Sequence, residues 1–261
     1  MTLACIDAGL SVGRKRLLGG VHARLEAGRL CAILGPNGAG KSTLLSLLSG
    51  QRPPTSGEVR LDERDIAGHA HAALALRRAV MPQESAVAFD FNAEEIVALG
   101  RLPHRLRPEA DESGIVPAAM ALTGVSALAT RILNTLSGGE KARVHLARAL
   151  AQIWHPRPDD ASRWLLLDEP TAALDVAHQH AVMVLARQWA ARGVGVVAVL
   201  HDLNLALRYA DEVIVLDQGG KVAQGPAADV LTPELVREVW RTQCERVTSG
   251  DGSPQFLFGS A

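Results

Sequence analysis

The feature that most constrains how this chain can fold is the stretch Gly35 to Ser42, which reads Gly-Pro-Asn-Gly-Ala-Gly-Lys-Ser. It satisfies the pattern GxxxxGK[ST], in which glycines let the backbone wrap closely around phosphate groups. An aliphatic run, Leu30 to Leu34, precedes it, and Thr43 to Leu48 follows as a predicted helix. Strand, loop and helix in this order predict a phosphate-binding loop at the edge of an α/β sheet.

Two side chains of this loop have separate predicted roles. We expect Lys41 to reach the β- and γ-phosphates of a nucleotide, and Ser42 to offer its hydroxyl to Mg²⁺. Backbone N–H groups at the start of the following helix supply further phosphate contacts. The predicted nucleotide contacts are Gly35, Pro36, Asn37, Gly38, Ala39, Gly40, Lys41, Ser42 and Thr43.

Two adjacent carboxylates, Asp168 and Glu169, end the aliphatic run Trp164 to Leu167. The C-terminal ends of parallel strands are where an open sheet presents its ligand residues. We therefore expect Asp168 to hold Mg²⁺, directly or through water, and Glu169 to polarise an attacking water. Such a pair is common without any function, but the phosphate loop upstream favours the catalytic interpretation.

Aliphatic runs alternate with helical segments along the rest of the chain. Runs of this kind are typical of parallel strands buried on both faces, with helices on either side. The segments before Gly28 and around Glu58 to Ile66 are short and turn-rich, which predicts a small antiparallel β-layer. The turn Gln218-Gly219-Gly220 predicts a late hairpin. The runs are Leu30 to Leu34, Trp164 to Leu167, Val194 to Leu200 and Val213 to Leu216.

Charge and cysteine content exclude several classes of protein. Lys and Arg number 27 against 28 Asp and Glu, a net charge of −1, so the chain lacks the basic surplus that binds nucleic acid or anionic lipid by charge. Three separated cysteines, Cys5, Cys31 and Cys244, predict neither a disulfide framework nor a cysteine zinc site. We expect no signal peptide and no membrane span, so that any membrane role comes through a partner.

Leu136 to Glu140 reads Leu-Ser-Gly-Gly-Glu. Locally it is a capping box, with Ser137 as N-cap and Glu140 three residues on, opening a helix that runs to about Ala151. A capped helix start with two glycines, Gly138 and Gly139, also leaves backbone donors accessible to an anion.

With this motif the sequence resembles the nucleotide-binding subunits of ATP-binding-cassette (ABC) transporters, whose signature is Leu-Ser-Gly-Gly followed by Gln or Glu. Six motifs follow one another in the order of that family and cover most of the chain. They are the phosphate loop, the Q-loop glutamine Gln83, the signature, the pair Asp168 and Glu169, the D-loop Ala173-Leu174-Asp175, and the switch histidine His201 before Asp202.

The resemblance implies an α/β fold: a P-loop NTPase ABC nucleotide-binding domain with an N-terminal antiparallel β-layer and an inserted α-helical subdomain. It implies a single domain over 1–261. Residues 1–83 and 161–261 would form the ATP-binding core with the β-layer, and residues 84–160, which are alanine-rich and helical in pattern, would form the helical subdomain with the signature.

The resemblance also implies a head-to-tail homodimer. Each ATP is held between the phosphate loop of one subunit and Ser137, Gly138, Gly139 and Glu140 of the other. Gln83 contacts Mg²⁺ or water, and the segment from Gln83 to about Arg105 relays closure to the membrane subunits, while His201 senses the γ-phosphate. The implied catalytic residues are Glu169, His201, Gln83 and Lys41, and the implied Mg²⁺ ligands are Ser42, Gln83 and Asp168.

One departure from the family concerns the adenine. The family usually stacks this base on an aromatic residue of the β-layer, shortly after a Leu-Ser pair. Here Leu10-Ser11 is followed by Val12, Gly13 and Arg14, and no Phe, Trp or Tyr precedes Phe89. We expect apolar contact from Val12, helped by Arg14, and weak discrimination of ATP from GTP.

The signature, Met81-Pro82-Gln83 and the His-Asp-Leu-Asn stretch 201–204 resemble importer subunits for iron chelates, haem and cobalamin. Three finer features favour haem. They are an extended loop Gln152 to Arg163, the pair His178-Gln179 after the D-loop, and the ending Pro254-Gln255-Phe256-Leu257.

The predicted function is therefore the ATP-hydrolysing subunit of an ABC importer that energises haem uptake. The chain would lie peripherally on the cytoplasmic face of the inner membrane, with two integral membrane permease subunits and, indirectly, a periplasmic substrate-binding protein. Nucleic acid is not an expected partner. The alternatives are the ATPase of a ferric-siderophore or cobalamin importer, and a soluble ABC ATPase of iron–sulfur assembly. Only 54 positions separate Gln83 from Ser137, too few for the coiled-coil insertion of chromosome and repair ATPases.

We expect no histidine of this chain to bind haem or a metal. In a helix, residues i and i+2 do not share a face, so the pairs His69/His71 and His178/His180 are poor chelates. His155 lies in a loop and is expected to be solvated.

Overall fold

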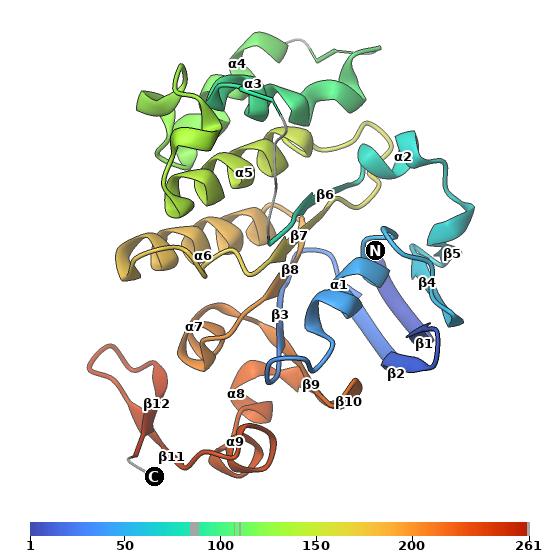
Figure 1. The fold of residues 1–261 in the computed structure, drawn as a ribbon, viewed down its shortest axis with the longest axis vertical. Helices are drawn as coiled ribbons and strands as arrows, with labels where there is room; N and C mark the ends of the chain where they lie inside the picture. Colours follow the sequence, from blue (N-terminus) through green and yellow to red (C-terminus); the bar gives the residue numbers. More distant parts are fainter. Residues whose placement is uncertain (84–88, 107, 110, 260–261) are drawn as a thin grey trace.

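The chain is built around a six-stranded sheet with strand order β10-β9-β3-β8-β7-β6 (Figure 1). A computed structural model describes residues 1–83, 89–106, 108–109 and 111–259. Neighbouring strands from β9 to β6 are parallel, and β10 pairs antiparallel with β9. In chain order the strands are β3 (Leu30–Leu34), β6 (Arg78–Met81), β7 (Trp164–Asp168), β8 (Gly195–Val199), β9 (Glu212–Asp217) and β10 (Gly220–Pro226).

The four aliphatic runs predicted as parallel strands are confirmed as β3, β7, β8 and β9, and the hairpin at Gln218-Gly219 is confirmed between β9 and β10. Strand β6 was not predicted from the sequence. This strand is four residues long and begins with an arginine, so it lacks an aliphatic run. It lies at the edge of the sheet, which explains the weak pattern.

The predicted antiparallel β-layer is a four-stranded sheet with order β2-β1-β4-β5. Its strands are β1 (Thr2–Val12), β2 (Lys15–Glu26), β4 (Ser56–Leu61) and β5 (Arg64–Asp65). Helix α1 (Lys41–Leu48) is sandwiched between this layer and the central sheet, because its buried leucines share one core cluster with Val21 of the layer and Ile33 of the sheet. The layer is thereby fixed beside the phosphate loop.

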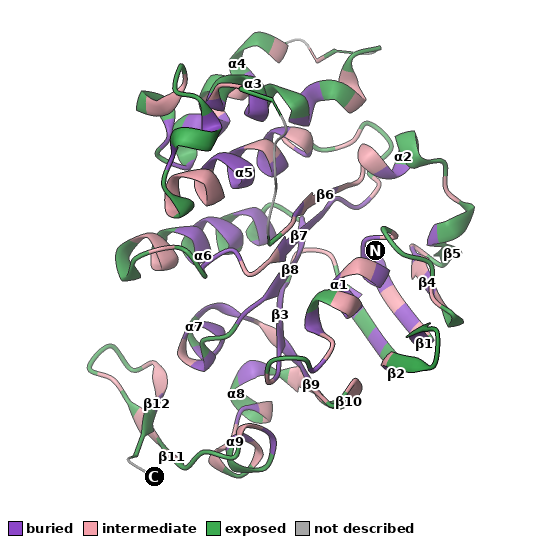
Figure 2. Cartoon of the chain, in the orientation of Figure 1, coloured by how far each residue is buried: buried purple, intermediate pink, exposed green. Residues whose placement is uncertain are grey.

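Helices α5 (Gly138–Gln152), α6 (Val176–Ala191) and α7 (Leu203–Tyr209) cover the other face of the central sheet. Figure 2 shows the central strands β3, β7 and β8 buried along almost their whole length, whereas the edge strand β10 is half-buried to exposed. The core there is mostly aliphatic, with Trp189 of α6 buried against Trp154 at a ring distance of 5.7 Å. The sheet is therefore covered on both faces, as parallel sheets require.

The regular elements described between β6 and β7 are all helices, as predicted, and they are joined by turns and loops; this segment forms the upper part of Figure 1. Its own core cluster includes Ile96, Ile115, Met120 and Val144. The helices of this segment are α3 (Ala93–Ala98), η2 (Leu99–His104), α4 (Glu112–Leu122), η3 (Ser126–Leu128), η4 (Leu133–Thr135) and α5. Two short helices, η1 (Ile66–Gly68) and α2 (His71–Ala75), precede β6.

The C-terminal part contains α8 (Ala227–Val230), α9 (Pro233–Trp240) and a hairpin of β11 (Cys244–Thr248) and β12 (Pro254–Phe258). Thr232 caps α9 by accepting from the Leu235 N–H at 3.3 Å. The hairpin was not predicted. Among the described residues, no helix has the length and apolarity needed to span a bilayer.

Candidate active site

The phosphate loop owes its shape to glycines that no other residue could replace. Gly35 has φ +148°, and a Cβ there would lie 2.1 Å from the Leu216 carbonyl oxygen. Gly40 is the N-cap of α1 with φ 99°, in the left-handed region. The loop therefore presents bare backbone at the start of α1, the arrangement that favours phosphate binding.

Lys41 is folded into this loop. Its Nζ donates to the carbonyl oxygens of Gly35 at 2.9 Å and Pro36 at 3.0 Å, and only 6% of the residue is exposed. Burial lowers the pKa of the ammonium, while the carboxylates of Glu169 and Asp168 oppose that shift. The lysine is held at the centre of the loop by carbonyl contacts that phosphate oxygens can replace.

Ser42 and Asp168 bring two oxygen donors together from different elements. Ser42, in the first turn of α1, donates its hydroxyl to Asp168 Oδ1 at 3.0 Å at the end of β7. Burial raises the pKa of the Asp168 carboxyl, and the hydrogen bond from Ser42 opposes that shift. A hydroxyl and a carboxylate side by side are the hard oxygen donors that Mg²⁺ prefers, so this pair fits a magnesium site.

Glu169 lies between Gln83 and His201. Gln83 Nε2 donates to Glu169 Oε2 at 2.8 Å, and His201 Nε2 lies 2.6 Å from Glu169 Oε1. These residues follow β6, β7 and β8, three neighbouring strands of the sheet, so the topology itself gathers them. Glu169 adopts φ 51°, an unusual value for a non-glycine residue and typical of strained functional positions. Both oxygens of the carboxylate are therefore oriented by neighbouring side chains.

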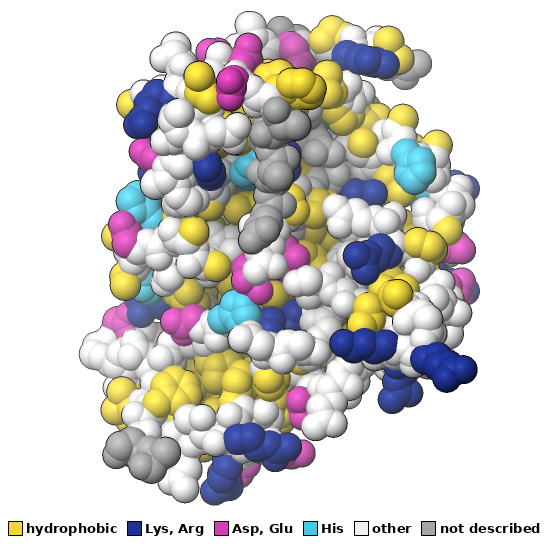
Figure 3. All heavy atoms as spheres, viewed as in Figure 1, with side chains coloured by type: hydrophobic (Ala, Val, Ile, Leu, Met, Phe, Trp, Pro, Cys, Tyr) yellow, Lys and Arg dark blue, Asp and Glu magenta, His cyan; other side chains and the backbone are white. Residues whose placement is uncertain are grey.

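A hollow of about 470 Å³ joins the phosphate loop to Glu169. Its β-layer wall is formed by Lys15, Arg16 and Leu17 at the start of β2, and Figure 3 shows Lys and Arg side chains gathered over this layer. Val12 and Arg14, which we expected at the base, are not among the lining residues. The sequence signal for this wall is the basic pair Lys15-Arg16 directly after the β1–β2 turn, and it was not recognised from the sequence.

The signature motif forms the predicted capping box. Ser137 Oγ accepts from the Glu140 N–H at 3.3 Å, and Glu140 Oε2 accepts from the Ser137 N–H at 2.8 Å. This backbone hydrogen bond lowers the pKa of the Glu140 carboxyl. A Cβ on Gly139 would lie 2.9 Å from the Ala173 carbonyl oxygen, so the D-loop packs directly against the signature.

Within one chain the predicted site is divided in two. The hollow at the phosphate loop and a second hollow of about 280 Å³ at the signature and D-loop have no lining residue in common. The chain brings together the phosphate loop, Gln83, Asp168, Glu169 and His201. It does not bring Ser137, Gly138, Gly139 and Glu140 to them.

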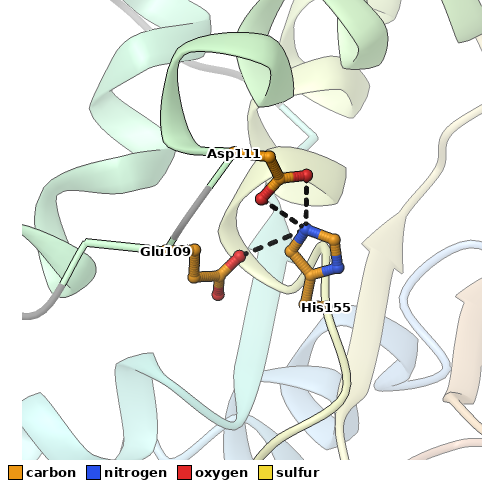
Figure 4. Close-up of side chains that lie close together, drawn as sticks. All are labelled: Glu109, Asp111 and His155. Atoms are coloured by element: carbon orange, nitrogen blue, oxygen red, sulfur yellow. Dashed lines mark hydrogen bonds and ion pairs between the residues drawn. The ribbon is translucent and has the colours of Figure 1, made fainter.

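His155 is not simply solvated, contrary to our expectation. Its Nε2 hydrogen-bonds both carboxylate oxygens of Asp111 at 3.0 Å and lies 3.4 Å from Glu109 Oε2 (Figure 4). These three residues are the one group within the described ranges whose donors are close enough for a shared metal ion. The Arg101 guanidinium lies 3.5 Å from Glu109 and offsets its charge, and His104 Nδ1 lies at the same distance, so the acids are already engaged by side chains of this chain.

His178 and His180 have separate partners, as their helical spacing predicts. His178 Nδ1 bonds Asp175 Oδ1 at 2.8 Å, and His180 Nδ1 bonds the Tyr209 hydroxyl at 2.7 Å. His69 lies at the end of η1 and His71 begins α2. His178 and His180 therefore do not share a partner, and His69 and His71 lie in different elements.

A phosphate loop, an oriented glutamate after β7 and a capped Leu-Ser-Gly-Gly-Glu helix define an ATP-binding cassette. The family model described as "ABC transporter" matches residues 18–172, and the chain belongs to the ABC transporter family. Among curated relatives, hemin import ATP-binding protein HmuV of Thermobifida fusca is 47% identical over 239 residues, covering 91% of this chain and 81% of that protein. HmuV of Methylobacillus flagellatus is 45% identical over 259 residues, covering 98% and 95%.

Solved structures that resemble this chain belong to the same family. A chain of a metal-chelate type ABC transporter in an inward-facing conformation superposes with a TM-score of 0.80 at 25% identity, covering 99% of this chain and 97% of that one. The dimeric ATP-binding cassette MJ0796, bound to ADP and Pi after hydrolysis, gives 0.73 at 26% identity, covering 86% and 98%. The predicted ABC fold and ATPase class are confirmed.

Proposed function

We propose that this chain is the ATP-hydrolysing subunit of an ABC importer that takes up haem across the inner membrane. The observation that carries the enzymatic part is the Glu169 carboxylate, held between Gln83 and His201 beside the phosphate loop. The cargo assignment is supported by the curated relatives, which are hemin import proteins at 45–48% identity over most of the chain.

The hydrolytic step uses groups that the fold already orients. The loop backbone and Lys41 bind the β- and γ-phosphates, and Glu169 polarises the water that attacks the γ-phosphorus in line. His201 and Gln83 each hold one oxygen of Glu169, so the base does not need to reorganise during the reaction. Ser42, Asp168 and Gln83 would hold Mg²⁺, which when bound would supply positive charge that offsets the phosphates.

A second copy of the chain completes the site. The signature hollow is separate from the phosphate loop within one chain, so Ser137, Gly138, Gly139 and Glu140 of one subunit would meet the nucleotide of the other, head to tail. The capped start of α5 offers backbone N–H groups that suit a γ-phosphate. The dimeric state of the cassette MJ0796 is consistent with this arrangement.

The surface that would receive the permease lies on another side of the molecule. A mostly apolar hollow of about 560 Å³ is lined by α2, by the end of η2 and by the loop after α5, and Leu102 and Leu106 are exposed beside it. It adjoins the predicted relay segment Gln83 to Arg105, of which 84–88 lie outside the described residues. We infer that the two permease subunits dock at this hollow, one on each copy of the chain. This would keep the chain peripheral on the cytoplasmic face. A periplasmic substrate-binding protein would act only through the permease.

The cargo is tested in cells. A deletion strain grown on haem as sole iron source is complemented with the wild type or with Glu169→Gln, and a ferric siderophore serves as control. Growth on haem restored by the wild type alone supports the proposal. Normal growth on haem, with failure on the siderophore or cobalamin, would keep the ATPase and overturn the cargo. No growth defect on any of them would favour the soluble assembly ATPase.

A further inference from the structure

The side chain of Asn204 is docked on the backbone of Phe256. Its Nδ2 donates to the Phe256 carbonyl oxygen at 3.1 Å, and its Oδ1 accepts from the Phe256 N–H at 2.7 Å. The amide thus pairs with both backbone groups of one residue, as a neighbouring strand would. Because both ends of the amide are used, the link fixes α7, which carries Asn204, relative to β12, which carries Phe256.

The hairpin β11–β12 is itself firmly attached to the core. Phe256 is only 2% exposed and belongs to the main core cluster. A second contact with α7 comes from Arg208, which donates to Asp251 at 2.7 Å and to Ser253 at 3.3 Å at the tip of the hairpin. Asn204 and Arg208 are four residues apart, so they lie on one face of α7. The hairpin therefore contacts this helix at two points.

Helix α7 leads directly to the switch histidine. It begins at Leu203, and Asp202 caps it by accepting from the N–H groups of Asn204 at 2.7 Å and Leu205 at 3.1 Å. A helix of seven residues is too short to be stable alone, so its position depends on what it packs against. His201 thus lies in the short connection between the end of β8 and the start of α7, and both elements determine its position.

We propose that Asn204 is a positioning residue for ATP hydrolysis: through it, the C-terminal hairpin holds α7 so that His201 stays within hydrogen-bond distance of Glu169. The inference rests on the roles of His201 and Glu169 in the proposed function. The His201–Glu169 distance is 2.6 Å, and a shift of about 1 Å would exceed a normal hydrogen bond. The hollow at the phosphate loop is lined by no residue of α7 or of the C-terminal hairpin, so nucleotide affinity should be kept.

The test introduces Asn204→Ala into the wild type and into His201→Ala. In the wild type we expect kcat to fall about tenfold, with the KM for ATP within about twofold, because misplacing a catalytic contact affects turnover more than binding. In the His201→Ala background the same change should have no further effect, because the contact it positions is already absent. Asn204→Asp keeps the acceptor for the Phe256 N–H and should retain part of the rate.

The matched control is Glu245→Gln, on the exposed side of the same hairpin, which should behave as the wild type. Melting temperatures and nucleotide-binding stoichiometry confirm that each variant is folded. An equal fall of kcat in both backgrounds would mean a general loss of structure and overturn the role of Asn204 while leaving that of His201. Full activity of His201→Ala alone would overturn both the inference and the proposed role of His201.

Discussion

His201 Nε2 lies 2.6 Å from Glu169 Oε1, although the two residues follow different strands and are separated by 32 positions in the chain. Gln83 donates a hydrogen bond to the other oxygen of the same carboxylate. The candidate base is thus fixed by residues from both neighbouring strands. A carboxylate held in this way needs little reorganisation before it can polarise a water.

Replacing Lys41 should remove most of the nucleotide affinity. In Lys41→Ala the buried ammonium and its charge-assisted contacts with phosphate are lost, and such contacts contribute roughly 1.5–3 kcal/mol, so we expect the Kd for ATP to rise about 10- to 100-fold. Titration with a fluorescent ATP analogue measures this. Lys221→Ala, at an exposed position of β10, serves as the charge-matched control and should bind normally. Unchanged affinity of Lys41→Ala would remove the phosphate-loop assignment.

The composite site can be tested by mixing two inactive variants. Gly138→Asp places a negative charge where the γ-phosphate of the other subunit would bind, whereas its Cβ meets the nearest atom at an ordinary 3.4 Å and an acid suits the first turn of a helix. Each of Gly138→Asp and Lys41→Ala alone should have almost no ATPase activity.

In an equal mixture, half of the dimers combine the two variants and contain one intact site, so activity should return to about a quarter of the wild type. Two copies of the same variant serve as the control and should stay inactive. If the mixture gains nothing over its components, the head-to-tail arrangement is wrong.

Nucleotide selectivity should be weak. The wall of the hollow near the predicted base position is formed by Lys15, Arg16 and Leu17 and contains no aromatic ring. A guanidinium can stack on either purine, and such contacts contribute about 0.5–1 kcal/mol at exposed sites, so ATP and GTP should compete within about fivefold. Arg16→Ala should weaken both nucleotides alike, by about threefold. Strong preference for ATP in a competition assay, or an effect of Arg16→Ala on ATP alone, would contradict this.

A partly buried ion pair in the helical segment should make stability depend on pH. Arg101, 7% exposed, donates to both oxygens of Glu112 at 2.8 Å, and this contact lowers the pKa of that carboxyl to about 2 from 4.5. A carboxyl whose pKa is depressed in the folded state stabilises it above the unfolded pKa, and the contribution disappears as pH falls through the folded pKa.

Glu112→Gln should therefore lower the free energy of unfolding by about 2 kcal/mol at neutral pH. The difference from the wild type should shrink between pH 4.5 and about 2. Urea denaturation at a series of pH values measures it. Glu94→Gln, an exposed acid in the first turn of α3, is the comparison variant and should show a much smaller effect. A gap between Glu112→Gln and the wild type that stays constant with pH would exclude this ion pair as its cause.

Much of the fold could be predicted because its strongest signals are local. The aliphatic runs of β3, β7, β8 and β9 and the capping box at Ser137 each depend on a few adjacent residues. The missed elements lack such patterns. Strand β6 carries Arg78 and lies at the sheet edge, and β11 reads Cys-Glu-Arg-Val-Thr, half-exposed throughout.

The candidate site residues were predicted from motifs, but their contacts depend on tertiary structure. No sequence spacing could show that Glu169 lies between Gln83 and His201, because the order of β6, β7 and β8 in the sheet decides it. The same holds for Arg16, which reaches the hollow only because α1 packs the β-layer beside the phosphate loop. His155 was misjudged because its partner, Asp111, is 44 positions away.

The most direct test of the account is the ATPase rate of purified Glu169→Gln beside the wild type, with nucleotide binding and dimerisation measured on the same samples. A positioned general base contributes about 10²- to 10⁴-fold, so turnover should fall by at least about 100-fold. Glutamine keeps the size of the side chain, so ATP affinity should be retained and ATP should trap a stable dimer. Hydrolysis at a near wild-type rate would contradict the assignment of Glu169 as the base.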